Sequence, residues 1–206
     1  MSETTSPAAV TRPDTSPNSS PHSSRGALPG SLPGDLPRRD RMARIVRVDH
    51  AGEYGAKRIY EGQIAVMGKG RHGKTLRHMA EQELVHLEYF EKQLNRRRVR
   101  PTLLQPLWHV TGFLLGAGTA VLGERAAMAC TVAVEEVIEE HYESQLKHLG
   151  PEEQELSDSI RKFQAEEVEH RDIGLQNEAE RAAGYPLLSA AIKAGTRAVI
   201  WVAERV

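Results

Sequence analysis

Apolar residues recur with the spacing of one helix face from residue 41 to the C-terminus, and no run alternates over the length of a strand. The pattern predicts six helices, near residues 41–69, 73–97, 104–122, 124–149, 152–182 and 187–205. Glycines and prolines separate them at Gly70, Gly73, Pro101, Gly150-Pro151 and Gly184-x-Pro186. The predicted fold class is therefore all-α, a four-helix bundle with two additional apolar or amphipathic helices.

Two of the predicted helices carry a Glu-x-x-His pair within an apolar face, Glu83 with His86 and Glu167 with His170. The apolar positions on these faces are Leu76, Met79 and Phe90 in one helix and Leu156, Ile160, Phe163 and Ile173 in the other. A face of this kind packs into a core. A carboxylate there is costly unless a metal ion, a proton or a cation compensates it.

A single glutamate on another helix precedes each pair. Glu53 lies 30 residues before the first pair, and Glu135 lies 32 residues before the second. In both halves a tyrosine, Tyr60 or Tyr142, follows the single glutamate by seven residues. Two hairpins with the same internal order indicate an inexact repeat.

The repeat predicts a metal centre. Glu and His three residues apart share a helix face, so two hairpins can aim four carboxylates and two imidazoles at one point. This donor set holds two metal ions in bundles and is typical of di-iron centres that react with dioxygen. A single Glu-x-x-His pair is common on solvated helices and does not by itself indicate a metal site. Among the glutamates near Glu135, Glu139 is the one that competes as a ligand. The predicted metal ligands are Glu53, Glu83, His86, Glu135, Glu167 and His170.

Two segments outside the repeat are strongly apolar. The stretch from Leu103 to Gly123 has an uninterrupted part of 17 residues, Leu107–Gly123, which barely reaches the lower limit for a membrane span. The last helix, from Leu187 to Val206, has charged residues along one side and aliphatic residues along another. It is predicted to be amphipathic, not spanning.

A cluster of arginines, Arg96, Arg97, Arg98 and Arg100, comes just before the first apolar segment. Basic residues beside an apolar helix suit a membrane surface with anionic headgroups. The alternative is that both helices pack on the bundle or in a homo-oligomer, with solvated arginines. Because two extra apolar helices exceed the needs of a four-helix core, we favour the membrane surface.

The composition of the 206-residue chain argues against some classes of protein function. Its formal net charge of −1 gives no general attraction to nucleic acid, and the single Cys130 fits a reducing compartment. Residues 1–40, rich in Pro, Ser, Thr and Gly, are predicted to be a disordered tail, and 41–206 the bundle domain. The tail lacks the apolar region of a secretory signal, and its acids and prolines do not fit a mitochondrial presequence.

Several longer motifs resemble the demethoxyubiquinone hydroxylase family of ubiquinone biosynthesis, over Arg41 to Val206. They are Asp49-His50-Ala51-Gly52-Glu53-Tyr54-Gly55-Ala56, Ile59-Tyr60-x-Gly62-Gln63, His78-Met79-Ala80-Glu81-Gln82-Glu83, Cys130-Thr131-Val132-Ala133-Val134-Glu135-Glu136 and Glu169-His170-Arg171-Asp172-Ile173-Gly174-Leu175. The resemblance implies a ferritin-like di-iron monooxygenase whose iron ligands are the six residues named above. Glu83 and Glu167 are the bridging ligands that it suggests.

The resemblance also implies an activity. Such an enzyme hydroxylates the ring of demethoxyubiquinol or demethoxyubiquinone, with two Fe ions as cofactor, O2 as co-substrate and electrons from NADH or the quinol. Its implied partners are a polyprenyl quinone, a membrane surface and a lipid-binding protein. We expect it on the cytoplasmic face of a bacterial inner membrane, or on the matrix face of the mitochondrial inner membrane. Trp108, Phe113, Leu114 and Trp201 are expected to receive the substrate.

Further residues have candidate roles around the ligands. Tyr60 and Tyr142 are expected to hydrogen-bond ligand carboxylates, with electron relay as a less favoured role. Asp49, one turn before Glu53, is a candidate acceptor for the second ring nitrogen of a ligand histidine; a surface aspartate is the alternative. His141 is a candidate catalytic residue, although most histidines of this kind are structural or solvated.

Two rival functions fit part of the sequence. A ferritin-like ferroxidase or iron-storage protein shares the ligand set, but it needs soluble outer faces. A non-catalytic, membrane-associated helical scaffold would carry the same carboxylates as ion pairs and would hold no iron.

Overall fold

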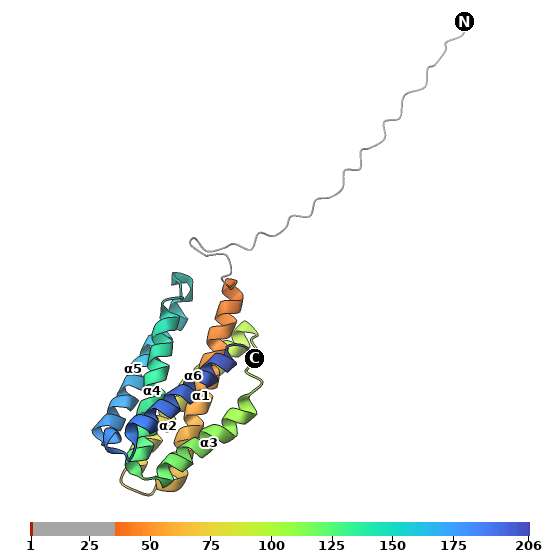
Figure 1. The fold of residues 1–206 in the computed structure, drawn as a ribbon. Helices are drawn as coiled ribbons and strands as arrows, with labels where there is room; N and C mark the ends of the chain where they lie inside the picture. Colours follow the sequence, from red (N-terminus) through yellow and green to blue (C-terminus); the bar gives the residue numbers. More distant parts are fainter. Residues whose placement is uncertain (2–35) are drawn as a thin grey trace. The chain divides into compact units, whose positions relative to one another are not determined.

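The computed structural model describes Met1 and residues 36–206 (Figure 1). The described residues form six α-helices and two short 3-10 helices, with no strand among them. The elements are α1 Arg38–Met67, α2 Gly73–Arg97, α3 Gln105–Val121, α4 Glu124–Leu146, η1 Pro151–Glu153, α5 Gln154–Gln176, η2 Ala179–Arg181 and α6 Tyr185–Ala203. The predicted all-α class is confirmed. Most of the predicted disordered tail lies outside the described residues.

Two helices end earlier than the sequence pattern predicts. α5 stops at Gln176 instead of residue 182, because the side chain of Asn177 donates to the carbonyl of Ile173 at 2.7 Å and Glu178 adopts a left-handed φ of 61°. α4 likewise stops at Leu146 instead of residue 149. No glycine or proline marks the end of α5, so the sequence pattern continues through it.

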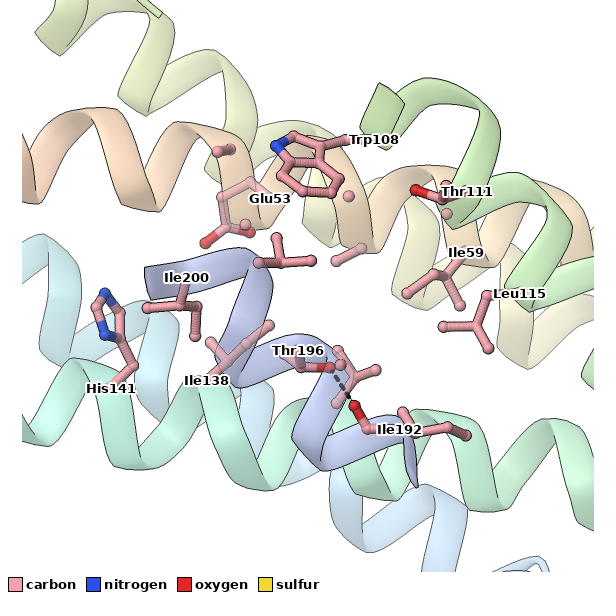
Figure 2. A pocket seen from close by; sticks show the side chains of 18 of the residues that line it. Glu53, Ile59, Trp108, Thr111, Leu115, Ile138, His141, Ile192, Thr196 and Ile200 are labelled. Atoms are coloured by element: carbon pink, nitrogen blue, oxygen red, sulfur yellow. Dashed lines mark hydrogen bonds between the residues drawn. The ribbon is translucent and has the colours of Figure 1, made fainter. Parts of the chain in front are cut away.

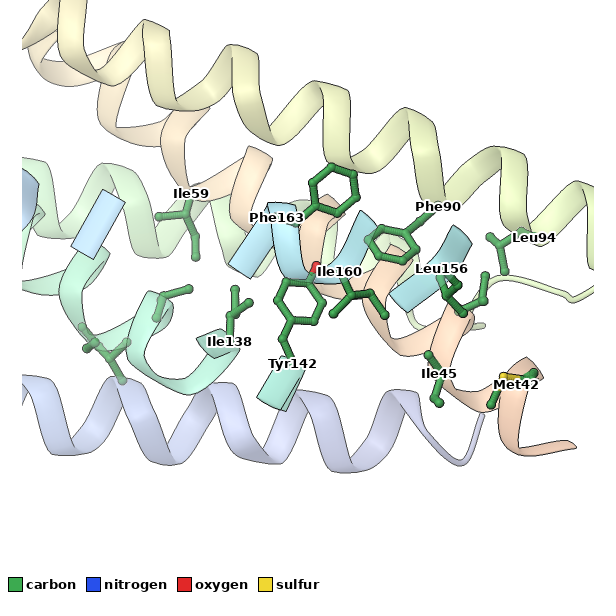
Figure 3. Packing of buried hydrophobic residues seen from close by; sticks show 14 of the residues in the cluster. Met42, Ile45, Ile59, Phe90, Leu94, Ile138, Tyr142, Leu156, Ile160 and Phe163 are labelled. Atoms are coloured by element: carbon green, nitrogen blue, oxygen red, sulfur yellow. The ribbon is translucent and has the colours of Figure 1, made fainter. Parts of the chain in front are cut away.

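Four of the helices, α1, α2, α4 and α5, form the bundle, while α3 packs mainly against α1 and α6 mainly against α4 (Figure 1). The predicted bundle with two additional helices is therefore confirmed. Its core is built from the predicted apolar faces, and Leu76, Met79, Phe90 and Ile160 are fully buried. Figure 3 shows Phe90 and Tyr142 facing each other within it, with ring centroids 6.5 Å apart.

Glycines bring α1 and α3 into backbone contact. A Cβ atom at Gly116 of α3 would lie 1.9 Å from the carbonyl oxygen of Ile59. One at Gly62 of α1 would lie 2.2 Å from the carbonyl oxygen of Phe113. Neither position can carry a side chain without separating the helices, so α3 is held close against α1.

The surface of the additional helices is partly apolar. None of the described helices is both long enough and apolar enough to cross a membrane. The large exposed apolar side chains on α3, α6 and the turn before α3 are Leu103, Leu107, Val110, Leu114, Val121, Leu187 and Trp201.

Two of the four arginines in the predicted basic cluster bind α5 and its N-terminal turn. Arg96 pairs with Glu155 at 2.7 Å and Arg97 pairs with Glu153 at 2.6 Å. These two side chains hold the end of α2 to α5, which leaves Arg98 and Arg100 as the members of the cluster without an ion pair to a described residue.

Candidate metal centre

The bundle brings the six predicted metal ligands together in its interior. α1 and α4 each supply one glutamate, and α2 and α5 each supply one glutamate and one histidine. The side chains are at most 1% exposed: Glu53, Glu83, His86, Glu135, Glu167 and His170. The apolar helix faces that the Glu-x-x-His pairs interrupt therefore face one another across the bundle.

The six side chains form two overlapping groups, and in each group the potential ligand atoms all lie within 4.8 Å of one another. The first group is Glu53, Glu83, His86 and Glu167. The second is Glu83, Glu135, Glu167 and His170. Only Glu83 and Glu167 belong to both groups, which is the position that a bridging carboxylate requires.

Unpaired buried atoms test whether a cation fits here. Both carboxylate oxygens of Glu83 and of Glu167 lack a hydrogen-bond partner, as do Nδ1 of His86 and Nδ1 of His170. The same holds for Oε2 of Glu53 and of Glu135. Leaving so many buried acceptors unpaired is costly, and two divalent cations would compensate them. The two-nitrogen, four-carboxylate donor set suits iron and similar first-row metals.

Without a cation, the buried carboxylates shift one another's pKa values. Burial, and next the charge of Glu167, raise the pKa of Glu83 and of Glu135 well above the usual value. The pKa of Glu167 is about 2, because the imidazoles of His170 and His86, which lie 3.2 and 3.1 Å from its oxygens, outweigh its burial. The pKa of His86 is about 12, since Glu53 and Glu167 outweigh the effect of burial. Protons therefore compete with metal ions for this site.

Each ligand histidine is oriented by the opposite hairpin. Nε2 of His86 lies 2.6 Å from Oε2 of Glu166, and Nε2 of His170 lies 3.0 Å from Oε1 of Gln82. With the proton on Nε2, each ring donates this hydrogen bond and keeps Nδ1 for a metal ion. The acceptor in each case is the residue just before the ligand glutamate of the other hairpin.

The sequence interpretation of Asp49 as such an acceptor is wrong. Oδ1 of Asp49 accepts a hydrogen bond from Nε2 of Gln145 at 2.6 Å and lies 3.5 Å from Nε2 of His141. Burial raises the pKa of Asp49, although His141 acts in the opposite direction. The polar partners of Asp49 therefore lie on α4, while Glu166 and Gln82 accept the hydrogen bonds of the two ligand histidines.

The two tyrosines connect the halves of the repeat. Tyr60 Oη donates to Oε1 of Glu135 at 2.8 Å, and Tyr142 Oη donates to Oε1 of Glu53. Burial, and then the adjacent carboxylates, raise both tyrosine pKa values well above the usual one, so both stay neutral donors. Glu139, the competing ligand, instead forms an ion pair with Arg171 and lies outside both ligand groups.

An apolar cavity of about 580 Å³ is lined by residues of α1, α3, α4 and α6, and of the six candidate ligands it reaches Glu53 (Figure 2). Glu53, Tyr142 and His141 lie on its wall, together with Trp108. Of the other residues expected to receive the substrate, Leu114 is 61% and Trp201 is 58% exposed. Phe113 packs under the guanidinium of Arg58, so none of these three lines the cavity.

Comparison with known proteins gives consistent matches. Residues 40–203 match the family described as ubiquinone biosynthesis protein COQ7. The chain is 58% identical over 164 residues to the 3-demethoxyubiquinol 3-hydroxylase of Rhodospirillum rubrum, covering 79% of this chain and 77% of that protein. It is 53% identical over 166 residues to the mitochondrial NADPH-dependent 3-demethoxyubiquinone 3-hydroxylase of Homo sapiens, covering 79% and 76%. The mitochondrial 5-demethoxyubiquinone hydroxylase of Saccharomyces cerevisiae is 41% identical over 182 residues, covering 80% and 78%.

Proposed function

The chain belongs to the ubiquinone biosynthesis protein COQ7 family, and from this premise we propose that it is a 3-demethoxyubiquinol 3-hydroxylase. It hydroxylates the ring of a polyprenyl demethoxyquinol with O2. The observation that carries the proposal is a buried set of four carboxylates and two imidazoles with ligand atoms that lack hydrogen bonds, one member of which, Glu53, lines an apolar cavity.

The cofactor that we propose is a pair of iron ions, which the six buried side chains would hold, Glu83 and Glu167 being the two that belong to both ligand groups. When bound, the iron pair supplies the redox chemistry that activates dioxygen for oxygen transfer to the ring. Overall, the ring C–H, O2, two electrons and two protons give a ring C–OH and one water. The electrons come from a nicotinamide nucleotide, as the name of the human relative implies, or from the quinol itself.

The surrounding residues set up this reaction. The hydroxyl groups of Tyr60 and Tyr142 fix the orientation of Glu135 and Glu53 through their hydrogen bonds. The apolar cavity excludes water from the side of Glu53 and accommodates an aromatic ring with a prenyl chain. His141, which lies on the cavity wall beside Asp49, is the candidate group for exchanging a proton with a ring hydroxyl.

Delivery of the substrate is proposed to occur at a membrane surface. The exposed apolar side chains of α3 and α6 border the two helices that frame the cavity, so a prenyl chain can pass from lipid between them. Arg98, Arg100 and Arg205 supply cations for anionic headgroups near Trp201 and the start of α3. A lipid-binding partner protein or a second copy of this chain are further candidates for this face.

The location that we propose is peripheral, on the cytoplasmic face of a bacterial inner membrane or on the matrix face of the mitochondrial one. The first accords with the Rhodospirillum rubrum relative, and the second with relatives named as mitochondrial. Both place the additional helices at the membrane on which ubiquinone is made.

The two rival functions, a ferroxidase and a non-catalytic scaffold, explain fewer of these observations. A ferroxidase has no use for an apolar cavity beside a ligand, and a scaffold of ion pairs would not gather four buried carboxylates around only two histidines. The quinone pool of a strain lacking this protein tests the proposal. We expect accumulated demethoxyubiquinone, relieved by the wild-type chain and not by Glu83→Gln. An unchanged quinone pool would overturn the function.

A further inference from the structure

One face of α1 forms a strip of bare backbone in the cavity. Gly52 and Gly55 lie between Val48 and Ile59 on the side that lines the cavity. A Cβ atom at either glycine would meet no heavy atom within 4 Å. Gly112, on the opposite helix α3, is different, because a Cβ there would lie 3.0 Å from the carbonyl oxygen of Gly55.

Helix packing therefore explains Gly112 but not Gly52 or Gly55. A glycine inside a helix is destabilising relative to alanine. Two of them within one turn of α1 weaken the helix, and no neighbouring atom requires their small size. What the missing methyl groups preserve is empty space beside Glu53.

A second observation comes from Trp108 on α3. Its side chain is 8% exposed and packs with Val48, Ala51 and Ala203. Its indole Nε1–H has no hydrogen-bond partner among the described residues. Figure 2 shows the indole of Trp108 on the wall of the cavity that Glu53 also lines. A buried, unpaired N–H is destabilising unless a ligand accepts its hydrogen bond.

We propose that Gly52, Gly55 and Trp108 form the subsite for the substrate ring. The planar ring lies against the bare backbone of α1, and the indole N–H of Trp108 donates a hydrogen bond to a carbonyl or methoxy oxygen of the ring. Indole is a donor only, so it selects an oxygen acceptor. The subsite rests on the proposed function, and it holds the ring at the Glu53 end of the cavity.

Fluorescence tests the position of Trp108 independently of turnover. The chain has two tryptophans, so Trp201→Phe leaves Trp108 as the reporter and Trp108→Phe leaves the exposed Trp201. The probe is a demethoxyubiquinone analogue with a short prenyl chain, added to the metal-loaded protein in detergent. We expect saturable quenching in Trp201→Phe and none in Trp108→Phe.

Hydroxylation of the analogue, measured alongside the quenching, distinguishes a failure of the subsite from a failure of the proposed function. If the wild type hydroxylates it while the emission of Trp108 stays unchanged, the subsite is wrong and the function stands. If Trp108 is quenched without any hydroxylation, the subsite stands and the proposed function fails. If neither occurs, both are overturned. For Trp108→Phe we expect a KM about tenfold higher, as for a lost hydrogen bond.

Gly55→Ala tests the bare backbone strip. The added methyl fits without a clash and favours the helix, so we expect thermal stability to be equal or higher while KM rises about tenfold. Gly118→Ala is the matched control, because it adds the same methyl to an exposed position of α3 with no heavy atom within 4 Å. An unchanged KM in Gly55→Ala would overturn the role of the strip.

Discussion

Glu166 and Gln82 occupy equivalent positions in the two hairpins, yet one carries a charge and the other does not. Each accepts the Nε2 proton of a ligand histidine, so an amide oxygen is sufficient for the role. Asp49 was the more obvious candidate in the sequence, since it lies one turn from Glu53. The choice depends on how α1, α2 and α5 are rotated against one another, which the spacing within one helix does not determine.

Substitution of Glu166 tests this role. Glu166→Leu removes the acceptor on His86, and we expect iron affinity or activity to fall about tenfold to a hundredfold. Glu166→Gln keeps an acceptor oxygen, as Gln82 does, and should retain most of both. Lys162→Met is the control, since it removes the ion pair to Glu166 at 3.7 Å and a contact with the ring of Phe163 but leaves the acceptor of His86 in place. Equal losses in Glu166→Gln and Glu166→Leu would show that charge, not hydrogen bonding, is what matters.

The titration of the buried ligands predicts how the metal-free protein responds to pH. The folded-state pKa values of Glu83, Glu135 and His86 lie above their unfolded values, so their contribution to stability is lost as pH rises. Glu167 acts oppositely, but only below its unfolded pKa of about 4.3. We expect the Tm of the metal-free protein to fall between about pH 5 and about pH 8.

Metal ions should remove this pH dependence, because they compensate the carboxylates in place of protons. Differential scanning fluorimetry of the metal-free and metal-loaded protein compares the two. The difference in Tm between the metal-loaded and the metal-free protein should increase as pH rises. In Glu83→Gln this difference should be smaller than in the wild type. A metal-free Tm that stays level or rises over this range would contradict the assigned pKa directions.

At the scale of elements, the helical spacing of apolar residues predicted each of the α-helices in the described part of the chain. The apolar helix faces that carry Glu83 and Glu167 predicted which side chains lie inside the bundle. The partner of each additional helix was not predictable. α3 pairs with α1 because Gly62, Gly112 and Gly116 allow backbone contact, a property of two helices together. The end of α5 was missed because it depends on a side-chain bond from Asn177 and a left-handed Glu178.

Gly116→Ala tests the contact between α1 and α3. A methyl group there meets the carbonyl of Ile59, and backbone cannot move aside as a side chain can. We expect a loss of about 2 kcal/mol or more in the free energy of unfolding, measured by chemical denaturation. Gly118→Ala, on the exposed side of the same helix, should be neutral or stabilising. Equal stability of the two variants would contradict close packing of α3.

At the scale of the whole molecule, the metal centre and the apolar outer faces belong to different helices but meet at the cavity. The bundle supplies a buried set of candidate ligands, and α3 and α6 complete the wall of the apolar cavity through which we propose that the substrate enters. Sequence motifs were sufficient to select the six side chains that the bundle brings together. They did not predict the cavity, because its wall forms only where Trp108, Ile138 and Ile200 come together from three helices.

The proposed membrane contact is testable on this scale. Leu114→Glu places a charge on the exposed face of α3, and we expect the fraction that co-sediments with anionic phospholipid vesicles to fall at least about threefold. Val85→Glu is the matched control, because Val85 is an exposed apolar residue of α2, outside the additional helices. Equal losses for the two variants would argue against docking through α3.

The central claim is that the six buried ligands hold an iron pair that transfers oxygen to the quinol ring. The most direct measurement loads the protein anaerobically with ferrous iron, adds a demethoxyubiquinol and admits isotopically labelled dioxygen. We predict about two irons per chain and one labelled oxygen atom in the hydroxylated ring, both lost in Glu167→Gln. Oxidation of the iron to mineral with an unlabelled, unhydroxylated quinol would contradict the account.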